Sequence, residues 1–319
     1  MSNNVCVIGG SRYFGRHLLG LLRDAGHRVT VVNRGSTPPP PGVEQLVADR
    51  DNEPELAAAL GARTFDVVVD QVCYHPVQAA TALRVFRGRT ARYVLTSSME
   101  VYNPVTSQAL PPQGPERPFT EEAVDPARWP VRMELPWSEY DFAAAGAGDT
   151  RYAEGKRQAE AVFAQDGGLP YAAVRCAHVL GGGSADFTGR LDHYTRRIAG
   201  AEAILVHPEV FPTAFIEYRE IADFLLWAAR SDFTGPVNAC SHGRLDAREL
   251  SGLIASAAGV EPSFLTVDPA SGDDASPFSF DHYYGMSNAR AERLGFAFSH
   301  TSDWLPGAIT ESLASRAAA

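Results

Sequence analysis

Short apolar runs rich in β-branched residues alternate with amphipathic stretches along the first half of the chain. Strands are predicted at residues 5–8, 28–33, 66–70, 92–96 and 171–175. The first amphipathic stretch, residues 16–25, predicts a helix that Gly26 ends, and helical patterns also separate the later runs. Buried strands joined by helices form parallel sheets, so the pattern predicts an α/β fold with a doubly wound parallel sheet.

The alternation stops in two places. Residues 103–150 are rich in proline, contain Trp129 and Trp137, and show little periodicity. Loops of that length are uncommon unless they are functional or disordered, and the tryptophans favour an ordered lid; a surface insertion without a role is the alternative. After residue 175 the chain mixes helices (220–229, 247–258) with short strands (214–216, 236–238). We therefore predict a sheet domain over residues 1–175, to which 214–240 returns, and a smaller lobe over 176–319.

Charge and composition exclude several kinds of partner. The formal net charge is −10, whereas a protein that grips nucleic-acid phosphates needs a basic face. No run approaches the ~20 apolar residues of a membrane span, and the first residues lack a basic leader followed by an apolar stretch. The four cysteines lie far apart and no histidine pair forms a ligand cluster, so we expect reduced thiols and no metal site. A cytoplasmic protein is predicted.

A glycine-rich turn follows the first strand. Gly9, Gly10 and Gly15 stand between that strand and an amphipathic helix, where glycine lets the backbone approach a pyrophosphate at the helix N-terminus. A structural turn without a ligand is the alternative, since three glycines at this spacing also occur by chance. The predicted contacts with a nicotinamide dinucleotide in a Rossmann-like domain are Gly9, Gly10, Ser11, Arg12, Tyr13, Phe14 and Gly15.

The end of the second strand indicates which dinucleotide binds. An acidic residue there holds the ribose 2′-hydroxyl of NAD, but this chain has Asn33 followed by Arg34, and Arg12 lies within the glycine turn. Guanidinium groups suit a 2′-phosphate, so NADP is favoured over NAD. The alternative is that both arginines are solvated surface charges. Asp49 is predicted near the adenine amino group, with a plain loop aspartate as its alternative.

Tyr152 and Lys156 are four residues apart in a predicted helix that Asp149 and Thr150 begin and Gly167 ends, so both side chains share one face. Of the 28 basic residues, 27 are arginine and Lys156 alone is lysine. A nearby ammonium favours the phenolate, so we expect the pKa of Tyr152 to fall below its usual ~10. Such a tyrosine exchanges a proton with a carbinol oxygen while hydride moves to or from nicotinamide.

The strand that ends in Ser97 and Ser98 places two hydroxyls at the carboxyl edge of the sheet, where ligands bind in this fold. Together these motifs resemble the extended short-chain dehydrogenase/reductase family, also called the NAD-dependent epimerase/dehydratase family. The resemblance implies that Ser98 donates a hydrogen bond to the substrate oxygen, Tyr152 is the acid/base and Lys156 anchors the ribose. It also implies a catalytic role for Glu100, although Met99 stands where some dehydratases have an aspartate.

The predicted function is NAD(P)-dependent hydride transfer at a carbinol or carbonyl carbon of a small polar substrate. A sugar-nucleotide epimerase or dehydratase is the first alternative. It is weakened by Thr213, where an arginine often helps to hold the diphosphate, and by His178, where many members have asparagine. A non-catalytic NADP-binding sensor is the second alternative. The resemblance further implies a homodimer.

Overall fold

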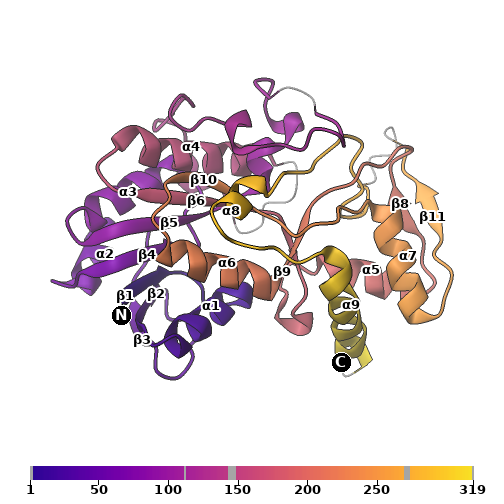
Figure 1. Ribbon diagram of the computed structural model, residues 1–319, viewed down its shortest axis with the longest axis horizontal. Helices are drawn as coiled ribbons and strands as arrows, with labels where there is room; N and C mark the ends of the chain where they lie inside the picture. The colour runs from indigo at the N-terminus through magenta and orange to yellow at the C-terminus, as the bar shows by residue number, and fades with distance from the viewer. Residues whose placement is uncertain (1–2, 111–112, 143–148, 269–273, 318–319) are drawn as a thin grey trace.

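The computed structural model describes residues 3–110, 113–142, 149–268 and 274–317. Its centre is a parallel sheet of seven strands in the order β10–β6–β5–β4–β1–β2–β3 (Figure 1). The strands are β1 (Asn4–Ile8), β2 (Arg28–Asn33), β3 (Glu44–Val47), β4 (Phe65–Asp70), β5 (Thr90–Ser98), β6 (Tyr171–Cys176) and β10 (Gly235–Ala239). The predicted doubly wound α/β class is confirmed, and the short strand β3 is the one element of the sheet that the hydrophobic pattern did not predict.

Helices cover both faces of the sheet because its strands are apolar on both sides. Val5 and Val7 of β1 pack in one core with α1 (Tyr13–Asp24) and α6 (Tyr218–Arg230). Cys6 and Ile8, which point to the opposite face, pack in a second core. The helices of that second core are α2 (Glu53–Leu60), α3 (Pro76–Phe86) and α4 (Thr150–Asp166). Figure 1 shows the sheet between these two helical layers.

A smaller lobe lies beside the carboxyl edge of the sheet (Figure 1). Its strands form two pairs, β7 (His178–Leu180) with β9 (Phe215–Glu217) and β8 (Ile204–Val206) with β11 (Phe264–Thr266). The remaining helices are α5 (Arg190–Ala199), α7 (Ala247–Ala258), α8 (Ala289–Arg293) and α9 (Thr301–Ala317). Within residues 214–240, α6 and β10 return to the central sheet, whereas β9 pairs inside the lobe. The division into two domains stays a prediction.

The lid segment, residues 103–150, is attached to the sheet through a buried ion pair. Arg175 of β6 and Glu160 of α4 are both fully buried, with 2.6 Å between guanidinium and carboxylate. The same guanidinium donates hydrogen bonds to the Tyr102 hydroxyl and to the backbone carbonyl oxygens of Glu121 and Val124 in the lid segment. This part of the lid is therefore held by a charged group of the core.

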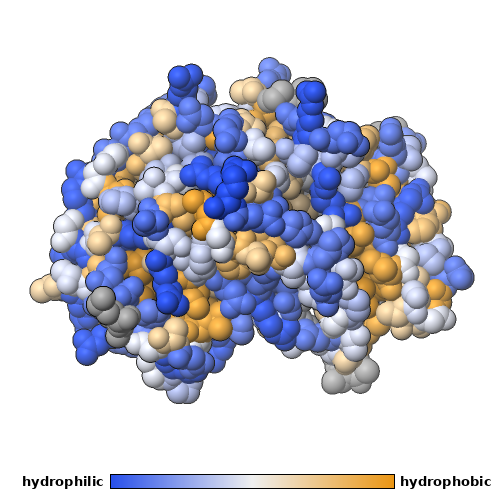
Figure 2. All heavy atoms as spheres, in the orientation of Figure 1, coloured by the Kyte–Doolittle hydropathy of each residue, from blue (hydrophilic) through white to orange (hydrophobic). Residues whose placement is uncertain are grey.

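The face of the molecule in Figure 2 is mostly hydrophilic, with several hydrophobic patches among the hydrophilic residues. No helix of the described residues is long and apolar enough to cross a membrane. All four cysteines are buried and unpaired, as the sequence predicted. The strand order reverses at β1, which pairs with both β2 and β4, and ligands of open α/β sheets bind outside the carboxyl ends of strands at such a reversal.

Candidate functional site

The glycine turn connects β1 to α1 and folds tightly against the loop after β4. Gly9 and Gly10 have φ angles of 80° and 72°, a region that side chains disfavour. A Cβ on Gly15 would lie 2.5 Å from the Cα of Gly10 and would collide with the side-chain oxygen of Gln71. The turn therefore requires glycine at these positions and leaves its backbone close to the N-terminus of α1.

Tyr13 begins α1 in an unusual conformation. Its φ of 51° lies in the left-handed region, where a bulky residue is strained. The ring stacks on Tyr218 with 5.8 Å between centroids and contacts Phe14 edge-on. The Tyr13 hydroxyl is buried and has no hydrogen-bond partner among the described residues. An unsatisfied buried hydroxyl is costly, so the Tyr13 hydroxyl would be stabilised by a hydrogen bond with a bound molecule.

The predicted cofactor residues outside the glycine turn differ in how they contact the rest of the protein. Asn33 donates a hydrogen bond of 2.6 Å to the Ser11 hydroxyl and so links the end of β2 to the glycine turn. Arg12 and Arg34 are exposed, and neither guanidinium forms a hydrogen bond or ion pair with a described residue. The Asp49 carboxylate instead accepts a hydrogen bond from the backbone amide of Asp51. Asp49 thus has a local structural contact, and its predicted place near adenine stays untested.

The helix that carries Tyr152 and Lys156 is α4, as predicted. The Asp149 carboxylate caps it by accepting a hydrogen bond from the Tyr152 amide, and Gly167 ends it in the left-handed conformation. Lys156 is 2% exposed, and its Nζ donates hydrogen bonds of 2.9 Å to the carbonyl oxygens of Cys73 and Thr96. Burial lowers the pKa of Lys156 to about 8. An ammonium has three N–H donors, so one remains for a further acceptor.

Tyr152 lies beside Ser98 and Glu100, so the four predicted catalytic residues come together in the fold. Burial raises the pKa of the Tyr152 phenol, neighbouring Tyr74 raises it further, and a hydrogen bond with Ser98 lowers it in part. The expectation of a lowered phenol pKa is therefore wrong for this structure. It fails because the loss of hydration disfavours the phenolate more strongly than the neighbouring donors favour it.

Glu100 follows Ser98 in a short 3₁₀ turn and is buried. Its carboxylate accepts a hydrogen bond from the Asn103 amide at 3.2 Å. Burial and then the nearby Glu100 carboxylate raise the pKa of Tyr284, a residue of the small lobe. Glu100 thus lies close to both Tyr152 and Tyr284.

His178 and Arg190 line the lobe beside Tyr284. The rings of His178 and Tyr284 are 5.6 Å apart, and His178 stacks on Phe280 at 5.7 Å. Arg190 lies 3.2 Å from Nδ1 of His178, and since a guanidinium only donates, Nδ1 accepts. Burial lowers the pKa of His178 well below its ordinary value. Its Nε2, and the hydroxyl of fully buried Thr213, have no partner among the described residues.

Two tyrosines of the site were not predicted. Tyr74 follows β4 by four residues, so its position beyond the carboxyl end of a central strand was a usable signal. Tyr284 could not be predicted, because it reaches the site through a bridge between its backbone and that of Thr213 in a loop of the lobe.

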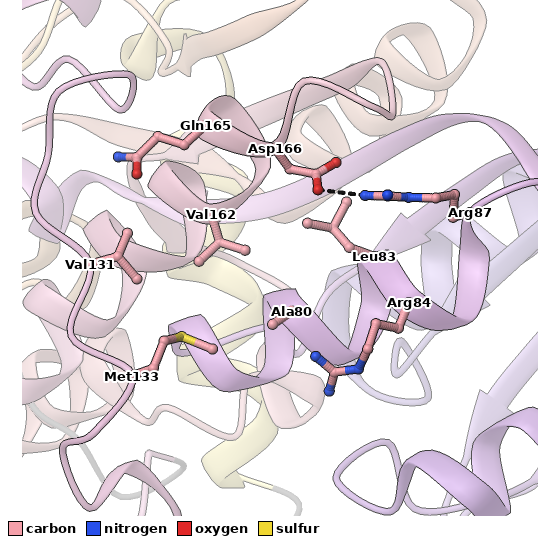
Figure 3. Close-up of a pocket in the computed structure, with 9 residues that line it drawn as sticks. All are labelled: Ala80, Leu83, Arg84, Arg87, Val131, Met133, Val162, Gln165 and Asp166. Carbon is pink, nitrogen blue, oxygen red and sulfur yellow. Dashed lines mark hydrogen bonds and ion pairs between the residues drawn. The ribbon is translucent and has the colours of Figure 1, made fainter.

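A separate surface pocket of about 630 Å³ lies on the outer side of α3 and α4 (Figure 3). Val131 and Met133 of the lid segment form one wall, and Arg87 and Asp166 form an ion pair of 2.5 Å at the opposite end. It contains none of the residues predicted from the motifs.

Comparison with known proteins agrees with this architecture. Residues 5–127 match the model of the NAD dependent epimerase/dehydratase family. A UDP-N-acetylglucosamine 4-epimerase from Methanobrevibacter ruminantium has a similar structure, with a TM-score of 0.69 and 18% identity over 99% of both chains. A dTDP-glucose 4,6-dehydratase from Bacillus anthracis has a TM-score of 0.70 and 13% identity over 97% of this chain and 96% of its own. Likeness at these identities shows the fold alone.

A curated relative is also similar in sequence. The 2′-dehydrokanamycin reductase of Streptomyces kanamyceticus is 28% identical over 137 residues, which cover 42% of this chain and 39% of the reductase. The chain thus spans about two fifths of the length of the curated relative that it matches. The glycine turn lies within residues 5–127, the part of the chain that is similar to the NAD dependent epimerase/dehydratase family.

Proposed function

We propose that this protein is an NAD(P)-dependent oxidoreductase that reduces a carbonyl group of a small polar substrate. The observation that carries the proposal is the cluster of Ser98, Tyr152 and Lys156 at the carboxyl edge of β5 and on the facing side of α4. A phenol, a hydroxyl donor and an ammonium are the groups that hydride transfer to a carbonyl requires from a protein.

The residues around the glycine turn fit a dinucleotide. Gly9 and Gly10 give the turn after β1 its positive φ angles, and Tyr13 at the start of α1 carries a buried hydroxyl without a hydrogen-bond partner among the described residues. Arg12 and Arg34 have free guanidinium groups that would bind a 2′-phosphate, which favours NADP over NAD. When bound, the nicotinamide supplies or accepts the hydride. The remaining N–H of Lys156 would donate to the ribose.

The protonated form of Tyr152 suits the reduction of a carbonyl group. Burial raises the pKa of the phenol above its usual ~10, so the phenol keeps its proton and can donate it to the oxygen of a carbonyl that accepts hydride. Ser98 would hold that oxygen by a second hydrogen bond. Similarity to a reductase over 42% of the chain supports the same direction.

A sugar-nucleotide epimerase is the second candidate, favoured by the structural likeness to such enzymes. At position 213, however, the chain has a fully buried threonine, which cannot neutralise a diphosphate. A small-molecule substrate of lower charge agrees better with that position. A cytoplasmic location and a homodimer stay predictions, and light scattering of the purified protein tests the second.

The proposal is tested by cofactor binding and turnover measured side by side. NADPH and NADH are titrated by fluorescence. The protein is then screened with ketone forms of sugars and aminoglycosides for loss of NADPH absorbance, and with nucleotide sugars for epimer formation by chromatography. Tyr152→Phe should retain NADPH binding and lose turnover. Unchanged turnover in that variant, or binding of neither cofactor by the wild type, would refute the proposal, and epimer formation would favour the second candidate.

A further inference from the structure

The Lys156 ammonium is enclosed by aromatic rings as well as by carbonyl oxygens. Its Nζ lies 4.5 Å from the ring centroid of Tyr74 and 5.7 Å from that of Tyr152. The two rings are 6.2 Å apart and inclined at 48°, so Tyr74 contacts both members of the pair. A cation held over a ring face within about 6 Å is attracted by the ring's quadrupole, more strongly when it is buried.

Tyr74 is in turn covered by the lid segment. Phe142 stacks on Tyr74 with 5.8 Å between centroids and 9° between planes, and it also stacks on His75 at 5.1 Å. Trp137 stacks on the same His75 ring at 6.1 Å. A continuous series of rings therefore runs from the lid to Lys156.

Gly155, between Tyr152 and Lys156, lets α4 approach Tyr74 and Phe142 closely because it has no side chain. A Cβ at that position would collide with the backbone carbonyl oxygen of Tyr74 and would lie 3.1 Å from the Phe142 ring. The lid also reaches the start of α4, because the Tyr140 hydroxyl donates to the Asp149 carboxylate that caps the Tyr152 amide. Helix, loop and lid thus meet at this glycine.

We propose that Tyr74 is a positioning residue that holds the Lys156 ammonium against Tyr152, and that Phe142 of the lid keeps Tyr74 in place. The catalytic meaning of this arrangement rests on the proposed function, whereas the arrangement itself does not. The other titratable groups that interact with Lys156 include Cys73, Asp70, Cys176, Arg50 and His75, and the variants below replace none of them.

The single lysine allows a direct test. Protein grown with lysine labelled with ¹³C at Cε gives one lysine ¹H–¹³C signal, whose shift is followed against pH. In Tyr74→Leu the signal should move downfield because the ring's shielding is lost. The pKa of Lys156 should fall by roughly 0.4 to 1.5, the range that corresponds to loss of a cation–π contact. Tyr74→Phe keeps the ring and should stay close to wild type.

A folded Tyr74→Leu protein with the wild-type signal and pKa would overturn the proposal, and so would a change in Tyr74→Phe as large as in Tyr74→Leu. If Tyr74→Leu does not fold, Phe142→Leu decides: the Lys156 signal should shift in the same direction by a smaller amount, and no shift refutes the coupling. Because these readouts need neither substrate nor cofactor, they are independent of whether the proposed reductase activity is found.

Discussion

Replacement of Lys156 by arginine should leave the protein folded and reduce its turnover steeply. The lysine ammonium occupies a site that is 2% exposed, with carbonyl oxygens at 2.9 Å on two sides and Tyr74 on a third. A guanidinium is larger and planar, and it cannot direct three donors from one atom. Forcing extra atoms into a packed site costs about 1–3 kcal/mol, which a domain of ordinary stability withstands.

The expected loss of turnover follows from the hydrogen bonds. A charge-assisted hydrogen bond contributes about 1.5–3 kcal/mol, so losing one that acts in the transition state slows the reaction about 10- to 150-fold. Lys156→Met, which removes the charge at similar length, serves as control and should lose at least as much. We would measure kcat with the carbonyl substrate found in the screen, the Kd of NADPH by fluorescence, and unfolding by circular dichroism. Wild-type kcat in folded Lys156→Arg would refute the reasoning.

Three further predictions concern cofactor preference, the pH dependence of stability and the buried ion pair. Arg12→Ala and Arg34→Ala should each raise the Kd of NADPH about tenfold with little effect on NADH, because only NADP has a 2′-phosphate for them to bind; equal losses for both cofactors would contradict the NADP preference. The free energy of unfolding should rise with pH between about 8 and 10.5 by at most about 3 kcal/mol, because the unfolded chain keeps the lysine proton up to about pH 10.5 whereas folded Lys156 loses it near pH 8. Denaturant titrations at several pH values measure this rise. An equal rise in Lys156→Met would show that other groups cause the pH dependence. Glu160→Gln should lower stability by about 3–5 kcal/mol because it leaves the Arg175 charge buried and unpaired. Glu53→Gln, at an exposed ion pair with Arg84, is its control and should have little effect; equal losses in the two variants would show that burial of the Arg175 pair is unimportant.

Local patterns predicted many of the helices and strands. Strand β2 and helix α7 have the predicted bounds, and α4 begins at the predicted cap and ends at the predicted glycine. These elements were predictable because their signals lie within a few residues of one another: a run of β-branched side chains, an aspartate that bonds a nearby amide, a glycine that adopts positive φ. Strand β3 was missed because two of its four residues are polar and it pairs only at the sheet's edge.

The candidate site divides in the same way. The positions of Ser98 at a strand end and of Tyr152 and Lys156 on one helix face could be read from local spacing, whereas Glu100 was expected only from the family resemblance; the catalytic roles of all four stay predictions. The environment of Lys156 was not predictable, because its acceptors Cys73 and Thr96 are 83 and 60 residues away in the chain. The hydrogen bond that the Asp49 carboxylate accepts from the Asp51 amide was also not predicted, although these two residues are close in the chain.

The sequence by itself determined the fold class, the glycine turn and the Tyr152–Lys156 pair, since spacing along a strand or helix sets which side chains share an edge or a face. Only the tertiary structure decided the direction in which the pKa of each group shifts. Burial removes water from both groups, so the phenol pKa rises where the sequence predicted a fall, and the lysine pKa falls to about 8. Hydration depends on everything that packs around a group, including Tyr74 and the lid, and those neighbours come from distant parts of the chain.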